Sequence, residues 1–197
     1  MSHYYKYIIP IIIVKLSIFF IISCNTDDFD QKNDAMQFYV DTSLLANSIY
    51  LENSNISLRP PIDWILFSEH ESTQLSIAIK DGDNIFEILL RNVFKSQNGA
   101  LMIISQVQSK VNNFGYIPPD YKELLKRQFS IKDIPSLKFP INEIPILQYL
   151  INTDELVIIR IFIDSISSYQ IDYIIPRNIY EKELKKIESS IGSINKQ

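Results

Sequence analysis

The chain has 197 residues, of which 46% are hydrophobic and 21% charged, and its formal net charge is −4 at pH 7. This length and apolar content fit one globular domain with a sizeable core, and they exclude a disordered chain or a disulfide-stapled miniprotein. The acidic balance argues against nucleic acid as a partner, because the phosphate backbone requires a basic surface. Only four glycines are present, which leaves little material for a loop that cradles phosphate.

Residues 1–23 contain no acidic side chain and end in an apolar run that Lys15 interrupts. A transmembrane span needs about 20 apolar residues, and only the short stretch 16–22 follows Lys15. That length is adequate for the apolar part of a signal peptide but too short to cross a membrane. We therefore predict a signal peptide over 1–23, with a plain membrane anchor as the alternative.

The signal segment closes on Ile21-Ile22-Ser23-Cys24, in which a small residue directly precedes the cysteine. This pattern resembles the lipobox of bacterial lipoproteins. The resemblance implies that Cys24 is the lipid attachment site, carrying a diacylglycerol thioether after cleavage behind Ser23. The protein would then be anchored to a membrane of the bacterial cell envelope, at the periplasmic face or the cell surface. Cys24 is the only cysteine, so no intramolecular disulfide can form.

Residues 24–36 are polar and acidic and show no hydrophobic periodicity. We interpret them as a tether between the lipid and a single folded domain over 37–197. The acidic stretch also resembles the export signal that sends some Bacteroidota lipoproteins to the cell surface. An ordinary solvated linker explains the same residues equally well.

The first half of the folded region carries weak patterns. A short helix is predicted over 43–51, and 56–59 alternates as a half-buried strand that Pro60-Pro61 ends. Residues 65–95 are ambiguous, with the apolar positions of 85–93 fitting a helical face slightly better than a strand. Asn98-Gly99 closes a predicted turn that begins at residue 96, because Asn-Gly readily takes positive φ, and a strand is predicted over 100–107.

A short helix is predicted to open after Pro118-Pro119-Asp120, with an apolar face formed by Tyr121, Leu124, Leu125 and Phe129. Pro135, Pro140 and Pro145 then exclude a long helix.

The last third of the chain is the clearest. Three β-rich runs, 146–151, 156–164 and 168–175, are separated by connections short enough for hairpins. The second run is apolar on both faces, which predicts a central strand covered on both sides. Asn178 is the predicted cap of a last helix. The apolar stripe of this helix must lie on the sheet, and it comprises Tyr180, Leu184, Ile187 and Ile191.

Two stretches resemble the PsbP-like fold, an α/β/α sandwich found in photosynthetic lumenal proteins and in many bacterial lipoproteins. One is 56–64, a strand followed by two prolines and Trp64; the other is the run 169–176 with the helix after it. The glycine usual just before the tryptophan is Asp63 here. The resemblance implies an α+β fold, with a mostly antiparallel sheet and a C-terminal helix packed across it, and a non-catalytic accessory function.

Residues suited to catalysis are sparse. His70 is the only histidine after the signal segment, and a solvated polar turn explains it better than a metal site, which needs three or four ligands. The run Asp81–Asn84 resembles the start of a calcium loop, but its twelfth position is Asn92 where a glutamate is required. We expect no catalytic residue, no cofactor and no metal ion.

The remaining polar side chains have structural explanations. Asp154, Glu155 and Asp164 fall at strand ends, where solvated acids are ordinary. Arg160 stands alone in an apolar strand and must be paired if its face is covered, with Asp172 as the candidate across the hairpin. On the last predicted helix we expect solvated salt bridges between three lysines and three glutamates: Lys182, Lys185, Lys186, Glu181, Glu183 and Glu188. Trp64 and the tyrosines are expected in core or interface positions.

Two functions follow as expectations. The first is a lipid-anchored envelope module that binds another envelope protein. The second is a module that binds a small molecule or lipid between the sheet and the helices. An enzyme is disfavoured, because a single histidine and no free cysteine leave little from which to build a site.

Overall fold

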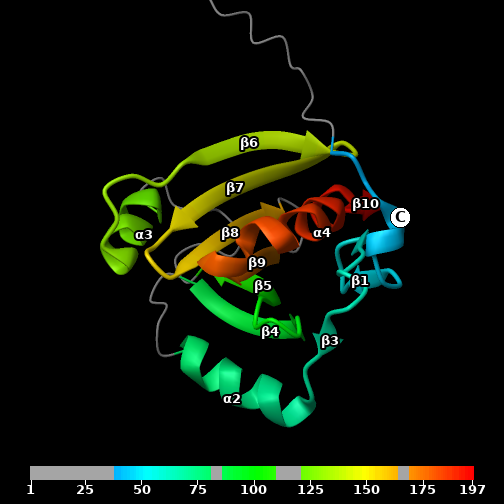
Figure 1. Cartoon of the computed structure of the whole chain (residues 1–197), viewed down its shortest axis with the longest axis horizontal. Helices are drawn as coiled ribbons and strands as arrows, with labels where there is room; N and C mark the ends of the chain where they lie inside the picture. The colour runs from blue at the N-terminus through cyan, green and yellow to red at the C-terminus, as the bar shows by residue number, and fades with distance from the viewer. Residues whose placement is uncertain (1–37, 81–85, 110–120, 164–168) are drawn as a thin grey trace, which may run out of the picture. The chain divides into compact units, whose positions relative to one another are not determined.

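The computed structural model describes residues 38–80, 86–109, 121–163 and 169–197 (Figure 1). The predicted signal peptide, Cys24 and the tether lie outside these ranges. So do the calcium-like run Asp81–Asn84, the Pro118–Asp120 helix opening and Asp164.

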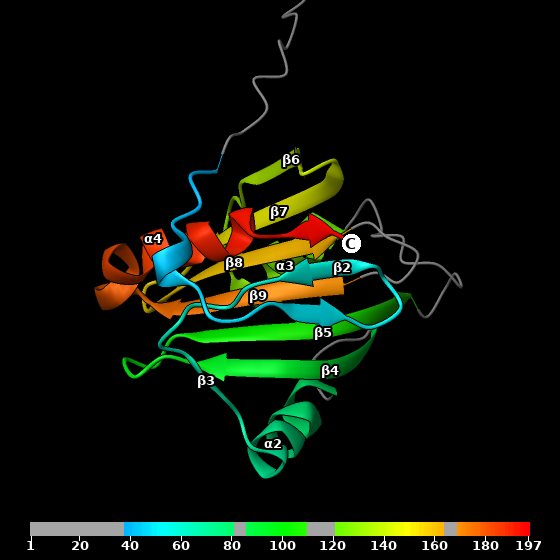
Figure 2. The same cartoon turned by 90° about the vertical axis from the view of Figure 1, so that its right-hand side faces the viewer.

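A seven-stranded sheet with the order β3-β4-β5-β9-β8-β7-β6 forms the centre of the fold (Figures 1 and 2). Every neighbouring pair is antiparallel. The last four strands of this sheet follow one another as a meander, and β9 then closes against β5. The strands are β3 (Ile65–Leu66), β4 (Phe86–Lys95), β5 (Leu101–Ser109), β6 (Ser136–Ile141), β7 (Ile144–Asn152), β8 (Leu156–Ile163) and β9 (Tyr169–Pro176).

The helix α4 (Tyr180–Gly192) lies across one face of this sheet, where Ile187 and Ile191 pack into the larger apolar core. The helix α3 (Tyr121–Phe129) covers the opposite face through Tyr121 and Leu125. The helix α2 (Glu69–Lys80) lies beside β4 (Figure 2). The predicted α+β class, a mostly antiparallel sheet with a C-terminal helix across it, is confirmed, and helices on both faces make it an α/β/α sandwich.

A second, three-stranded sheet with the order β1-β2-β10 packs on the same core as α4. All three residues of β2 are buried, because this strand lies between the other two. The predicted strand at 56–59 is therefore confirmed, but its half-buried alternation is wrong. The strands are β1 (Ile49–Leu51), β2 (Ile56–Leu58) and β10 (Asn195–Lys196).

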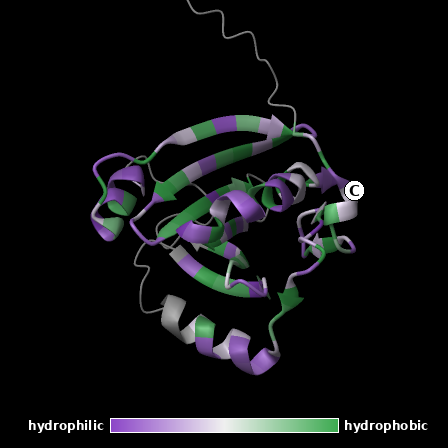
Figure 3. Ribbon diagram, viewed as in Figure 1, coloured by the Kyte–Doolittle hydropathy of each residue, from purple (hydrophilic) through white to green (hydrophobic). Residues whose placement is uncertain are grey.

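The strand β8 is buried on both faces, as its sequence predicts. Ile159, Ile161 and Ile163 face the α4 side of the sheet, whereas Ile158 and Phe162 face the α3 side. Figure 3 shows the central strands as largely hydrophobic ribbons, while α3 and α4 carry hydrophilic residues among apolar ones.

The predicted helix over 43–51 is wrong. The chain forms a 3-10 turn there, η1 (Thr42–Leu44), followed by the strand β1 at 49–51, and the Asp41 carboxylate accepts the Ser43 N–H at 3.1 Å. The chain then turns away because Ala46 donates its N–H to the carbonyl of Pro60 at 2.8 Å. Pairing with a distant segment therefore overrides the local helical preference.

The helical preference at 85–93 is also wrong for the part that the structure describes, because residues 86–93 lie in β4. This strand pairs along its length with β5, and the register shifts between Leu90 and Asn92. Such a bulge displaces the apolar residues from strict alternation, which explains the misleading pattern. The predicted turn before β5 is confirmed, with Gly99 at a φ of +90°.

The last helix does not start as predicted. Asn178 lies in a 3-10 turn, η2 (Arg177–Ile179), and α4 begins after Ile179 without a side-chain cap. The apolar stripe of α4 nevertheless lies on the sheet, with Ile187 and Ile191 buried. Burial of the stripe, and not a polar cap, positions this helix.

Two of the prolines sit inside strands of one hairpin. Asn142 and Glu143 have positive φ and form the two-residue turn between β6 and β7. Ile141 and Ile144 flank this turn, and Pro140 and Pro145 are the next pair along the two strands. Flanking pairs of such turns are hydrogen-bonded and the next pair is not. The missing N–H groups therefore cost no bond between the two strands.

The chain enters the described domain across the last turn of α4. The Phe38 ring lies 5.6 Å from that of Phe139 on β6. A Cβ atom built on Gly192 would come within 2.6 Å of the Phe38 Cβ and 2.8 Å of a Val40 methyl. The absence of a side chain at Gly192 permits this close crossing.

We predict that Gly192→Ala lowers the free energy of unfolding by about 1–3 kcal/mol, since the added methyl has no room beside Phe38. An alanine in an open helical position would raise it by about 1 kcal/mol instead. Urea denaturation measures the difference. The loss should shrink in a Phe38→Gly, Val40→Ala background, and an unchanged loss there would contradict the crossing as its cause.

Candidate interaction surface

The segment Pro61–Leu66, called the Trp64 segment below, combines one buried aromatic residue with three exposed aliphatic ones. Trp64 is 5% exposed, whereas Ile62, Ile65 and Leu66 are 59%, 67% and 53% exposed. A turn closed by the Trp64 N–H on the Pro61 carbonyl (3.2 Å) leads into the short edge strand β3. Figure 3 shows β3 as a hydrophobic segment at the margin of the fold.

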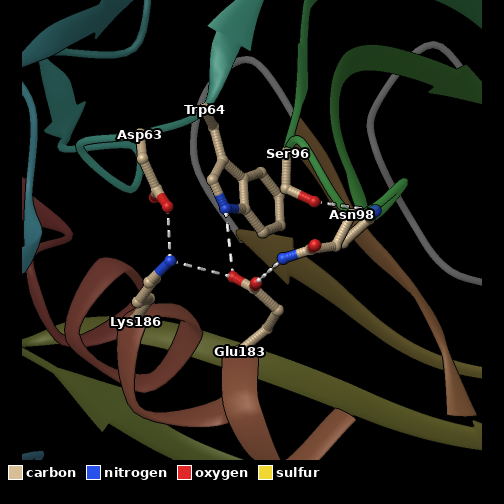
Figure 4. A network of polar contacts seen from close by, with 7 residues as sticks. Asp63, Trp64, Ser96, Asn98, Glu183 and Lys186 are labelled. Carbon is tan, nitrogen blue, oxygen red and sulfur yellow. Dashed lines mark hydrogen bonds and ion pairs between the residues drawn. The ribbon is translucent and has the colours of Figure 1, made fainter. Parts of the chain in front are cut away.

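Trp64 is held from two sides. Its ring meets that of Tyr173 on β9 edge-on, with centroids 6.4 Å apart. Its indole Nε1–H points to the Glu183 carboxylate on α4 at 3.4 Å (Figure 4). The Tyr173 hydroxyl in turn shares a hydrogen bond of 2.9 Å with Ser190. The sheet and α4 therefore both fix the position of the Trp64 segment.

Glu183 is the centre of this network (Figure 4). Its side chain is fully buried, and it accepts a hydrogen bond from Asn98 Nδ2 at 3.2 Å and pairs with Lys186 Nζ at 3.3 Å. Asn98 belongs to the β4–β5 turn, so one carboxylate ties that turn and Trp64 to α4. The expected solvated role of Glu183 is therefore wrong: α4 turns this side chain inward, where a charge must be paired.

Lys186 bridges Glu183 and Asp63 of the Trp64 segment. Burial opposes the charged form of Lys186, but the hydrogen bonds and charges of Asp63 and Glu183 outweigh it and raise the pKa of this lysine. The neighbouring Lys185 makes an exposed ion pair with Asp41, as expected for a surface lysine. The Asp63–Lys186–Glu183 chain thus fastens the Trp64 segment to α4.

A second buried network lies on the α3 side of the sheet. Arg160 and Asp172 are register partners on β8 and β9 and form two hydrogen bonds of 2.8 Å. Arg160 Nη1 also donates to the Tyr121 hydroxyl at 2.6 Å. The expected pairing of Arg160 with Asp172 is confirmed. Burial disfavours the guanidinium charge, but Asp172 and Tyr121 more than compensate and raise the pKa of Arg160.

Gln170 extends this second network. Its Nε2 donates to Asp172 Oδ2 at 2.8 Å, whereas its Oε1 is buried and, in the described part of the chain, has no hydrogen-bond partner.

His70 lies in the first turn of α2, not in the polar turn that its sequence predicts, and it is exposed. Ser68 and Glu71 cap this helix: the Ser68 N–H and hydroxyl bond the Glu71 carboxylate at 2.9 and 2.7 Å. This bonding lowers the pKa of Glu71. The Ser-x-x-Glu spacing of such a cap was present in the sequence and would have predicted the helix.

The other candidate residues are not brought together. Asp154 and Glu155 are exposed in the short connection between β7 and β8. Among the described residues no group of three or more His, Cys, Asp or Glu side chains could hold a metal ion. Within the same residues no helix has the length and apolar character needed to span a membrane.

The fold therefore defines an α+β protein with an antiparallel sheet between helices. The solution structure of cyanobacterial PsbP (CyanoP) from Synechocystis sp. PCC 6803 is similar, with a TM-score of 0.47 and 8% sequence identity. The similarity covers 77% of this chain and 92% of that one, and it concerns the fold alone. No protein-family model matches the sequence, and no curated protein matches it.

We predict that Glu183→Gln lowers the free energy of unfolding by about 1–3 kcal/mol, because Lys186 loses a buried counter-charge and the amide cannot accept from all three donors. Glu181→Gln, on the exposed side of the same helix, should change it by less than about 0.5 kcal/mol. Denaturant titration of both variants makes the comparison. Equal effects would contradict the central role of Glu183.

We predict that Arg160→Leu costs about 3–5 kcal/mol, because it leaves the Asp172 carboxylate buried without a counter-charge. The double variant Arg160→Leu, Asp172→Leu removes both charges and should recover part of the loss. A double-mutant cycle by thermal unfolding measures the coupling. Additive losses would show that the two side chains do not stabilise each other.

Proposed function

We propose that this protein is a non-catalytic interaction module, anchored to a membrane of the bacterial cell envelope by a lipid on Cys24. Its contact surface for another envelope protein is the Trp64 segment. One observation carries the proposal: Ile62, Ile65 and Leu66 are exposed, although the tryptophan among them is held rigidly by Tyr173 and Glu183.

Single exposed aliphatic residues are ordinary on protein surfaces. Three of them within five residues, on a backbone fastened by a buried tryptophan, are better explained by a partner. A rigid surface loses little conformational entropy when it binds, so more of the apolar contact contributes to affinity.

The surroundings of the Trp64 segment fit a protein partner. Asp63 and Lys186 form an ion pair beside the exposed aliphatic residues, and the exposed Lys95 pairs with Ile65 across the strands. An apolar centre with a charged rim is the usual anatomy of a protein–protein interface.

The lipobox Ile21-Ile22-Ser23-Cys24 supports the anchor. Lipid attachment would confine the domain to the layer next to a membrane, where any envelope partner is also confined. The effective concentration of the two proteins rises accordingly, so a small contact surface suffices.

One observation favours the alternative, a module that binds a small molecule. The buried Gln170 Oε1 lacks a donor in the described part of the chain, and it lies next to the Arg160–Asp172 pair through its own Nε2. A small guest with a hydroxyl or amino group would satisfy this oxygen, as would a buried water molecule.

We predict that the protein, labelled with radioactive fatty acid in a bacterium that processes lipoproteins, incorporates label at Cys24. The Cys24→Ala variant should lose the label, because no other thiol is available in the chain. Gel autoradiography after solvent extraction measures it. Label retained in Cys24→Ala would place any lipid elsewhere and refute the anchor.

The contact surface is tested in the native envelope with a photo-crosslinking amino acid at Ile65, and at the exposed Tyr50 of β1 as the matched control. We expect one adduct at 65 and none at 50. Leu66→Asp should abolish the adduct at 65, because a charge would enter the apolar contact, whereas Thr73→Asp on α2 should not. Equal crosslinking at both positions, or no effect of Leu66→Asp, would refute the proposed surface.

A further inference from the structure

We infer that the β6 edge of the domain rests on the surface of the membrane to which the protein is anchored, with Tyr39 and Leu137 in contact with lipid. This inference rests on the proposed lipid anchor at Cys24. The inference adds to the proposed anchor by assigning which edge of the sheet contacts the bilayer and which edge lies away from it.

The first reason is where the chain enters the described domain. Phe38 packs on Phe139 of β6, and its Cβ lies against Gly192 of α4. Three residues later the Asp41 N–H donates to Ser189 Oγ at 3.2 Å, and its carboxylate pairs with Lys185. Figure 1 shows this first described stretch, in blue, beside the end of β6. The attachment point of the tether is thus fixed at this edge.

The second reason is the length of chain between that point and the anchor. Residues 25–37 separate Cys24 from Phe38. Covalent geometry alone limits a stretch of that length to about 45 Å even when it is fully extended. The edge that carries Phe38 therefore stays close to the lipid headgroups, and even a weak contact there is strongly populated.

The third reason is what this edge exposes. Tyr39, next to Phe38, is 80% exposed, the largest value among the exposed large hydrophobic residues of the described chain. Leu137 is 43% exposed and lies two residues before Phe139, on the same face of β6. Tyrosine is enriched where apolar and aqueous phases meet at a membrane surface. The exposed Lys138 between Leu137 and Phe139 can reach lipid phosphates.

The strand order places the Trp64 segment far from the β6 edge. The Trp64 segment includes β3, and β3 and β6 are the two opposite edge strands of the seven-stranded sheet. Six strand spacings of about 4.8 Å separate them by about 29 Å. A domain that meets lipid along β6 therefore keeps the Trp64 segment away from the bilayer, where it is free for a protein partner.

The test uses the full-length lipidated protein in phosphatidylcholine vesicles that contain acyl-chain-brominated lipid, which quenches nearby tryptophan. Tyr39→Trp and Leu137→Trp place reporters on the β6 edge. Leu89→Trp is the matched control, because Leu89 is 48% exposed and its strand β4 is five strands from β6. The buried Trp64 gives the background, measured in the unsubstituted protein.

We expect brominated lipid to quench the reporters at 39 and 137 at least about twofold more than the reporter at 89. Flotation of the same samples on a density gradient reports the anchor independently. If the lipidated protein floats and Cys24→Ala does not, but all three reporters are quenched equally, the inference is overturned and the anchor stands. If the unsubstituted protein does not float, the anchor fails, and this inference fails with it.

Discussion

Burial of the central strands on both faces is the constraint on which the rest of the structure depends. β8 and β9 contribute to the apolar cores on the α4 side and on the α3 side of the sheet. Each face needs a cover, so a helix lies on each. Any charge within these strands must then be paired, and Arg160 is paired in register with Asp172. Tyr121 on α3 joins that pair, so the same charge also places the covering helix.

The opposite face repeats this arrangement with different residues. The fully buried Glu183 joins α4 to Trp64 and to the β4–β5 turn. Such a network contributes modestly to net stability, because desolvation offsets much of its attraction, but it accepts only one arrangement of its donors. Its consequence lies at the surface: the backbone that bears Ile62, Ile65 and Leu66 cannot fold these side chains inward while Trp64 occupies the space beneath. The buried network around Glu183 therefore keeps the aliphatic side chains of the Trp64 segment exposed to solvent.

The elements that could be predicted from the sequence are those whose buried face shows as a local hydrophobic periodicity. The apolar runs of β7, β8 and β9 and the stripe of α4 were predictable, since two-sided burial and helical spacing leave clear patterns. β4 was not, because its bulge near Arg91 breaks the alternation. Glu183 was also missed: among Lys182, Lys185 and Glu181 it resembles any solvated residue, and only contact with Trp64, more than a hundred positions earlier, distinguishes it. The exposure of Ile62 and Ile65 could not be predicted from the sequence, because aliphatic side chains are usually expected in the hydrophobic core.

By itself, then, the sequence determined the α+β class, the meander with its covering helix and the pairing demanded of Arg160. Its run Ile21-Ile22-Ser23-Cys24 also resembles a lipobox, on which the proposed anchor at Cys24 rests. Only the tertiary structure decided which edge of the sheet Phe38 packs against, which glutamate is buried and which aliphatic residues stay exposed. The physical reason is distance along the chain. The hydrophobic periodicity of a segment shows only which face of its own helix or strand is buried. The contacts of Phe38 with Gly192 and of Trp64 with Glu183 join segments that are far apart in the sequence, so no local pattern predicts them.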